Sequence, residues 1–197
     1  MRAPIRLVGV EQAQARLREA GRRVDPVMRG ALNTTATQTR KQRYNEPMRP
    51  AFTSAFANRR IVIKRARAGR MNARLIPSSS GVNVTAYRRW IFEPINSTRA
   101  RIYVVGPNGR KVAAGFVNPS GRLQRPLSTR SQRARTARGR SPNVTSYTYR
   151  RALQEAQGPS VAYWFRLLTT AKTIRWTNAF LRQEFERRIR RELEKAV

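Results

Sequence analysis

The stretch that decides the fold spans residues 102–117 and reads IYVVGPNGRKVAAGFV. Two runs of mostly apolar residues, Ile102–Val105 and Ala113–Val117, flank the turn-forming triplet Pro107-Asn108-Gly109. An Asn-Gly pair between such runs is a strong local signal for a tight β-hairpin, because both residues tolerate the backbone angles that the turn requires. The stretch therefore predicts two adjacent antiparallel strands.

Further strand-like runs precede this hairpin. They are short, rich in Val, Ile, Tyr and Trp, and separated by Gly, Asn, Pro and Ser, as is typical of strands joined by turns. The runs are Ile61–Ile63, Ala73–Ile76, Val82–Val84 and Tyr87–Phe92. Together with the hairpin they predict an antiparallel meander over residues 59–120.

Helical patterns occupy the N-terminal part. Apolar residues recur at steps of three and four over Val10–Val24, which predicts a first helix. Asp25 followed by Pro26 has the form of a helix start, since the carboxylate accepts from free amides and proline suits the first helical position. We therefore expect a second helix over Pro26–Tyr44, and one further short turn or helix over Ala51–Asn58. The expected inner face of the helix over Pro26–Tyr44 consists of Met28, Ala31, Leu32, Thr35 and Ala36.

The C-terminal part is also expected to be helical. A helical section opens at Gly158–Phe165, and a long helix is expected over Lys172–Ala196. Its expected buried stripe consists of Ile174, Leu181, Phe185, Ile189 and Leu193. Pairs of opposite charge four residues apart are expected on its solvated face, namely Glu184 with Arg188, Glu186 with Arg190, and Arg190 with Glu194.

These patterns predict an α+β fold in which the terminal α-helices pack on a twisted antiparallel β-sheet, with a long Arg-rich extended arm. A length of 197 residues fits a single domain. Its expected parts are a helical region at 1–58, the β-meander at 59–120, the arm at 121–142 and a helical region at 158–197.

The charge is the most unusual property of the chain. Lys and Arg number 42 against 10 Asp and Glu, which gives a net charge of +32. All basic residues except Lys41, Lys64, Lys111, Lys172 and Lys195 are arginines. Such a surface repels itself unless a partner neutralises it, and arginine favours bidentate contacts with phosphate or carboxylate.

Composition argues against an enzyme. The chain has no His and no Cys, so it lacks an imidazole base, a thiol nucleophile and the usual zinc ligands. Glu93 is the only acid between Arg59 and Arg151, so paired carboxylates for acid–base catalysis are absent there. The segment 106–111 has neither the glycine spacing nor the Ser or Thr of a nucleotide-binding loop. We expect no catalytic residue, metal, cofactor or small-molecule substrate.

The sequence shows no membrane-spanning stretch. No apolar run approaches the roughly 18 residues that cross a bilayer, and the first residues lack the apolar core of a secretion signal. We expect a protein that acts in a cytoplasm or within an assembly.

The Arg-rich segment at 121–142 is the candidate contact region. Ser, Thr, Gln and Ala separate its arginines, and this composition predicts disorder in isolation. The candidate contact residues are Arg122, Arg125, Arg130, Arg133, Arg135, Arg138 and Arg140. A solvated charge run, an arm along a phosphate backbone and an arm across acidic protein subunits all fit the pattern, because guanidinium groups match phosphate and carboxylate alike. Residues 59–70 are a second candidate for ordering on contact.

Aromatic residues give a weaker signal. Tyr147 and Tyr149 beside two arginines resemble a stacking platform for nucleic acid, but their alternation equally fits one face of a strand. Trp164 and Trp176 are typical anchors of a core or an interface. The candidate interface element consists of Gly158, Pro159, Ser160, Val161 and Trp164.

The order of these parts resembles the minor tail protein Z family of long-tailed bacteriophages. The resemblance rests on a helix after a Gly-Val-Glu start, the segment Ala31–Ala36, the Arg-rich β region, the element Gly158–Val161 and the helical stretch Phe180–Arg191. It spans nearly the whole chain, although the middle matches only in composition and strand order. The segment 121–142 departs from the family pattern.

The resemblance implies a structural role without catalysis. A member of this family completes the tail and makes it competent to join a filled head at the neck. The implied partners are the portal or connector, the tail terminator or tail tube, and further copies of the chain in a ring, and both acidic protein rings and packaged DNA remain candidate partners for the arginines. The implied location is the tail and neck of the virion, after assembly in the host bacterial cytoplasm.

A function of another class also fits the charge. A non-specific nucleic-acid-binding protein, either DNA-condensing or ribosome-associated, would carry the same excess of arginine. Such a protein binds free duplex DNA with a steep salt dependence, whereas a neck component binds free DNA weakly and requires preassembled rings.

Overall fold

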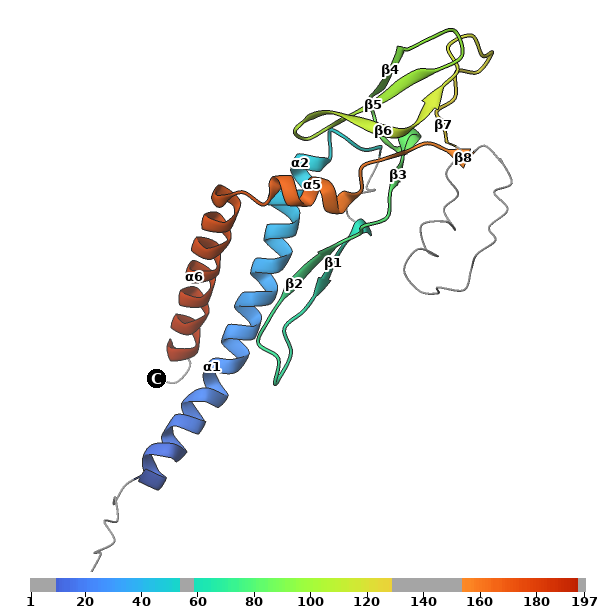
Figure 1. The fold of residues 1–197 in the computed structure, drawn as a ribbon. Coiled ribbons are helices and arrows are strands. Elements are labelled where there is room, and N and C mark those ends of the chain that lie inside the picture. Colours follow the sequence, from blue (N-terminus) through green and yellow to red (C-terminus); the bar gives the residue numbers. More distant parts are fainter. Residues whose placement is uncertain (1–9, 54–58, 129–153, 195–197) are drawn as a thin grey trace, which may run out of the picture. The chain divides into compact units, whose positions relative to one another are not determined.

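The computed structural model describes residues 10–53, 59–128 and 154–194, with residues 10–23 described by their backbone alone. The helical elements are α1 (Val10–Thr39), the π-helix η1 (Arg40–Asn45), α2 (Glu46–Met48), the 3-10 helix η2 (Val84–Ala86), α5 (Val161–Leu168) and α6 (Ala171–Glu194). The strands are β1 (Ile61–Lys64), β2 (Arg74–Pro77), β3 (Val82–Asn83), β4 (Trp90–Pro94), β5 (Ala100–Gly106), β6 (Gly109–Val117), β7 (Leu127–Ser128), β8 (Gln154–Glu155) and β9 (Gln157–Gly158). Helices and antiparallel strands confirm the α+β class (Figure 1).

The chain forms two compact units, each built from segments that are distant in sequence. The first unit consists of residues 1–41, 63–76 and 170–197, and the second of residues 42–62 and 77–169. The first unit contains α1 and α6, while the second contains α5 and all strands from β3 to β9.

Helix α1 is continuous where two helices were predicted. It runs for 30 residues, with Pro26 inside it. A proline within a helix removes one backbone hydrogen bond, but its fixed φ is itself helical, so the helix continues through it. The prediction of a helix start at Asp25 is therefore wrong. The predicted end at Tyr44 also differs: the α-helix ends at Thr39, and the π-helix η1 continues to Asn45.

Helices α1 and α6 run antiparallel and side by side, as Figure 1 shows. Val27, Ala31, Thr35 and Thr39 recur at four-residue steps on α1 and are all buried, as is Ala36, which confirms the expected inner face at Ala31, Thr35 and Ala36. Met28 and Leu32 are only half-buried. Small and hydroxyl-bearing side chains therefore line this helix pair.

The buried side of α6 differs from the predicted apolar stripe. Thr173 and Glu184 are the buried residues of this helix, whereas Ile174 and Leu193 are 51% and 63% exposed. Leu181, Phe185 and Ile189 are half-buried. The predicted stripe is therefore wrong at its two ends. The side of α6 that meets α1 carries Thr177, whose hydroxyl lies 3.4 Å from that of Thr39.

The seven-stranded sheet has the order β3-β9-β6-β5-β4, and β7 pairs with both β6 and β8. The predicted hairpin is confirmed: β5 and β6 are antiparallel, Gly106 faces Gly109, and Pro107 and Asn108 form the loop. Gly109 has a φ of +98°, which only glycine adopts readily. The meander prediction holds for β4, β5 and β6 but not beyond, because β9 separates β3 from β6 and β1 pairs with β2 in a separate sheet.

Helix α5 packs on this sheet within the second unit. The hydroxyl of Ser160 caps the helix by accepting from the backbone N–H of Tyr163 at 3.2 Å, and Val161 and Trp164 are buried. The terminal helices α1 and α6 instead pack on each other, so the predicted helix-on-sheet arrangement belongs to α5. Of the expected short turn or helix over Ala51–Asn58, residues 51–53 are described and residues 54–58 lie outside the described residues. Ala51 lies in a turn, in which its N–H donates to the carbonyl of Met48 at 3.0 Å, and Phe52 then bridges Tyr87 as in a strand.

Candidate polyanion-binding surface

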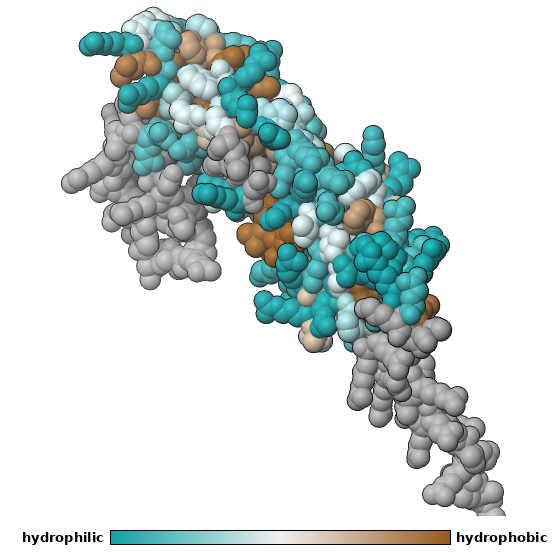
Figure 2. Space-filling view, turned by 180° about the vertical axis from the view of Figure 1, so that it is seen from behind, coloured by the Kyte–Doolittle hydropathy of each residue, from teal (hydrophilic) through white to brown (hydrophobic). Residues whose placement is uncertain are grey.

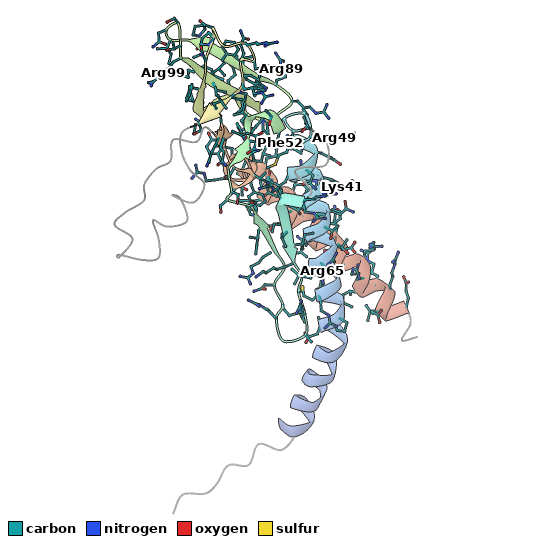
Figure 3. The ribbon with its side chains drawn as sticks, turned by 90° about the vertical axis from the view of Figure 1, so that its right-hand side faces the viewer. Lys41, Arg49, Phe52, Arg65, Arg89 and Arg99 are labelled. Carbon is teal, nitrogen blue, oxygen red and sulfur yellow. The ribbon has the colours of Figure 1, made fainter. Side chains whose placement is uncertain are left out.

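Basic side chains are exposed on both units. Figure 2 shows hydrophilic residues over much of the described surface in view, and Figure 3 marks Arg65 near β1, Arg89 beside β4 and Arg99 beside β5. Each of these three side chains is exposed, and none forms an ion pair with a carboxylate of the described residues.

The first part of the expected arm is folded. The backbone N–H of Gly121 donates to the carbonyl of Asn118 at 3.1 Å, Gln124 adopts a φ of 41°, and β7 follows at Leu127. The prediction of disorder is therefore wrong for residues 121–128, where a turn and a strand use the backbone hydrogen bonds. Residues 59–70 are also already folded, with β1 at their centre.

The predicted contact residues divide at residue 128. Arg122 and Arg125 are exposed on the loop between β6 and β7. Five of the seven candidates lie outside the described residues, as do Tyr147 and Tyr149. Those five are Arg130, Arg133, Arg135, Arg138 and Arg140.

A hollow lies on the sheet where β5 and β6 fall out of register. Arg101 faces Phe116 and Tyr103 faces Val112. The three residues 113–115 of β6 therefore oppose the single residue Ile102 of β5. Such a bulge bends its strand and increases the local twist. The hollow has a volume of about 470 Å³.

Two arginines are among the residues that line this hollow. Arg99 directly precedes β5 and Arg101 lies on it, and the larger side chains among the other lining residues are Ile95, Val112 and Phe116. No acid is among its lining residues. The hollow can accommodate a phosphate or carboxylate group between the two arginines.

One acid interrupts the basic surface of the sheet. Glu93 faces Arg101 across β4 and β5, and its carboxylate lies 3.4 Å from a guanidinium nitrogen of Arg110. Both side chains of this ion pair are more than half exposed, so the pair contributes little to stability. Lys111 and Arg166 approach the ring of Tyr163 to 5.6 and 5.9 Å, within the range of cation–π contacts.

The candidate interface element forms part of the core of the second unit. The hydroxyl of Tyr87 donates to the carbonyl of Pro159 at 2.6 Å and accepts from the indole N–H of Trp164 at 3.0 Å. Gly158 is the end of β9, and Ser160 is the cap of α5. These residues join the sheet to the helix in the folded chain.

Gly106 is a packing requirement of the same core. A side chain at this position would meet the indole ring of Trp164, which is 1% exposed and has no room to move aside. The glycine therefore allows the hairpin to approach α5 closely.

Burial raises the pKa of Tyr87 above its ordinary value, although the hydrogen bond from Trp164 opposes the change.

Glu184 is a buried acid of the first unit. Its carboxylate accepts from Arg187 at 2.7 Å and from Arg188 at 2.7 Å, and the hydrogen bond from Arg187 chiefly lowers its pKa. Arg188 also donates to the hydroxyl of Thr34 on α1 at 2.9 Å. The predicted ion pair of Glu184 with Arg188 is confirmed, but its predicted location on a solvated face is wrong, because Glu184 is buried.

The other predicted ion pairs of α6 are not formed. Glu186 pairs with Arg182 at 3.0 Å instead of with Arg190. Within the described residues Arg190 has no ion pair, so its predicted pairs with Glu186 and Glu194 are wrong. Arg190 remains an exposed cation.

The described residues contain no group of three or more His, Cys, Asp and Glu that would hold a metal ion. Among the same residues, no helix combines the length and apolar character needed to cross a bilayer.

Sequence reasoning missed Asn33. Its side-chain carboxamide donates to the carbonyl of Ala66 at 3.2 Å and accepts from the Ala66 N–H at 2.8 Å. This pair holds residue 66 of the loop after β1 against α1. An asparagine within a helical pattern, where it is a poor helix former, is the signal that identifies such a contact.

Comparison with known proteins finds no match: no family model, no curated protein and no solved structure is similar to this chain.

Proposed function

We propose that this protein is a structural component of a tailed-bacteriophage virion that completes the tail and joins it to the head. It acts by adhesion, through many arginine contacts to neighbouring ring proteins of the neck and to packaged DNA. Several copies form a ring or bind to one. No catalytic step, metal or cofactor belongs to this proposal.

The observation that carries the proposal is the set of exposed arginines without a carboxylate partner among the described residues. Members of this set occur in both units and on helices, strands and loops alike, and they include Arg65, Arg74, Arg89, Arg99, Arg101, Arg122, Arg125 and Arg190. A net charge of +32 destabilises the isolated chain by self-repulsion and favours a negatively charged environment. Acidic ring proteins and DNA both supply that environment.

The hollow between Arg99 and Arg101 supports contact with protein. Its lining combines two arginines with the apolar residues Val112 and Phe116, and this mixture suits an acidic residue flanked by apolar ones. Guanidinium–carboxylate bonds there would be charge-assisted and geometrically specific.

The resemblance to the minor tail protein Z family supports the biological setting. Two of the segments that carry it occupy structurally important positions: Ala31–Ala36 contributes three buried residues to α1, namely Ala31, Thr35 and Ala36, and Gly158–Val161 joins β9 to α5. They belong to the framework that presents the arginines.

The proposal is tested on phage particles. A phage that lacks this gene should give full heads beside separate or defective tails in electron micrographs, and purified protein added back should restore joined particles. Normal joined particles without the gene would contradict the proposal. Empty heads without packaged DNA would also contradict it and would favour the nucleic-acid-binding alternative.

A second experiment tests the arm. Replacement of Arg130, Arg133, Arg135 and Arg138 by Gln should abolish add-back without lowering the melting temperature, because the arginines act on contact. A matched control removes four charges elsewhere, by Gln at the exposed positions Lys41, Arg49, Lys172 and Arg175. An equal loss in both variants would show that total charge, and not the arm, determines joining.

A further inference from the structure

The loop between β1 and β2 is the most basic compact element of the described chain. Residues 64–74 read KRARAGRMNAR and contain no acid. All five basic side chains are exposed, and none pairs with a described carboxylate. They are Lys64, Arg65, Arg67, Arg70 and Arg74.

Two of these arginines face each other at the tip. The backbone N–H of Arg67 donates to the carbonyl of Arg70 at 3.1 Å, and the Arg70 N–H donates to the Arg67 carbonyl at 3.0 Å. Ala68 and Gly69 form the two-residue turn between them, with a φ of +73° at Gly69. Directly opposed residues of an antiparallel pair project from the same face, so the two guanidinium groups repel each other. An anion that binds both would relieve this repulsion.

The element is narrow. The residues between its arginines are mostly Ala66, Ala68, Gly69 and Ala73, which leave the guanidinium groups as the largest side chains of the tip. The major groove of duplex DNA admits a two-stranded β-ribbon of this kind. Residues 61–77 contain no aromatic residue, so the ribbon lacks the stacking platforms that single-stranded nucleic acid requires.

The ribbon is also held in place before any partner binds. Asn33 on α1 forms its two hydrogen bonds with the backbone of Ala66, which is 4% exposed. A contact element that is already ordered loses less conformational entropy on binding.

We propose that the β1–β2 ribbon, with Arg67 and Arg70 at its tip, binds the phosphate groups of duplex DNA at a groove. The proposed contact is independent of sequence, because phosphate groups carry no sequence information. This inference goes beyond the proposed function, since the same contact would serve a protein that only coats or condenses DNA.

The first test measures the salt dependence of binding to a fluorescent DNA duplex by the full chain. The slope of log K against log salt concentration is negative, and the double variant R67Q/R70Q should make it less steep by about two, because each lost phosphate contact removes about 0.9 from its magnitude. The control K172Q/R175Q removes the same charge from exposed positions on α6 and should leave the slope nearly unchanged. An equal decrease in both variants would overturn the proposal, because it would assign binding to overall charge.

The second test locates the contact directly. The chain has no cysteine, so a single one can be introduced at Ala68 on the turn and coupled to a photo-crosslinker. The A68C protein should crosslink to the duplex far more than A179C, which places the same group at an exposed position on α6. Equal crosslinking from both positions would overturn the proposal.

Competition separates the partner classes. An unlabelled duplex should displace the labelled duplex from the wild-type protein much better than single-stranded DNA or polyglutamate of equal charge. Equal displacement by polyglutamate would overturn the proposal in favour of an acidic protein partner. A defect of R67Q/R70Q in DNA binding together with normal add-back to phage would leave the inference standing and separate it from the joining function.

Discussion

The hydroxyl of Tyr87 and the indole N–H of Trp164 form a hydrogen bond of 3.0 Å in the core of the second unit. Tyr87 precedes β4 and Trp164 lies on α5, and both side chains are at most 2% exposed. Because the same hydroxyl also donates to the carbonyl of Pro159, one oxygen atom links three points of the chain. Buried polar groups of this kind contribute most when every member has a partner.

Replacement of Tyr87 by Phe should destabilise the protein by about 1–3 kcal/mol, because it leaves the Trp164 N–H and the Pro159 carbonyl without their partner. Chemical denaturation followed by tryptophan fluorescence measures the change. The control is Tyr103→Phe, which removes a hydroxyl from a half-buried ring without a described hydrogen bond and should change stability by less than about 0.5 kcal/mol. Equal effects would show that the hydroxyl of Tyr87 has no special role.

Replacement of Asn33 by Ala should destabilise the first unit by about 1–3 kcal/mol. The variant loses both hydrogen bonds to Ala66 and leaves a buried backbone N–H without a partner. Hydrogen exchange should show faster exchange of the Ala66 amide in the variant. The exposed position Lys41 serves as the control, and a Lys41→Ala protein with the same exchange rate at Ala66 as Asn33→Ala would contradict this assignment.

Replacement of Thr35 by Val should stabilise the protein by about 1 kcal/mol. The Thr35 side chain is buried, and its hydroxyl has no hydrogen-bond partner among the described residues, so an apolar group of the same shape removes a cost. Thermal denaturation measures the gain. Thr39→Val is the matched control, because its hydroxyl lies 3.4 Å from that of Thr177 and its loss should give no gain. A lower melting temperature for Thr35→Val would contradict the prediction.

The buried Glu184 should make stability depend on acidity. Hydrogen bonds from Arg187 and Arg188 lower its pKa from the ordinary 4.5, so its contribution is complete above that value and is lost as pH falls through the lower folded pKa. Glu184→Gln should therefore be less stable than the wild type at pH 7, and the difference should shrink at acidic pH. Urea denaturation at a series of pH values measures it.

The matched control for this titration is Glu186→Gln. Glu186 and Arg182 form a surface pair whose side chains are 50% and 83% exposed, so its loss should change stability by less than about 0.5 kcal/mol at any pH. If the two variants showed the same pH profile, burial of Glu184 would not be the cause.

Local sequence signals predicted the elements better than their partners. The hairpin at residues 102–117 follows from its turn residues, and the helical section expected to open at Gly158–Phe165 corresponds to α5. The pairing of β3 with β9 could not be predicted, because each strand has two residues and no periodicity, and the partners lie far apart in sequence. The helix start at Asp25 failed because a local cap pattern competed with a longer helix that tolerates Pro26.

The candidate site was predicted only in its chemistry. Arginine content indicated an anion-binding surface, and Arg122 and Arg125 are indeed exposed. The hollow beside Arg99 depends on a bulge in β6, and the opposition of Arg67 and Arg70 depends on the exact position of a turn. Both are properties of strand register, which composition does not determine.

The polar contact between α1 and α6 has a consequence for alignment. The guanidinium of Arg188 lies over Gly30, where any side chain would meet it, and it also reaches Thr34. A slip of one helical turn would place this large cation against Pro26 or Thr34 instead of the open position at Gly30. A helix pair packed through leucines alone would tolerate such a slip, whereas the contacts of Arg188 favour one register of α1 against α6.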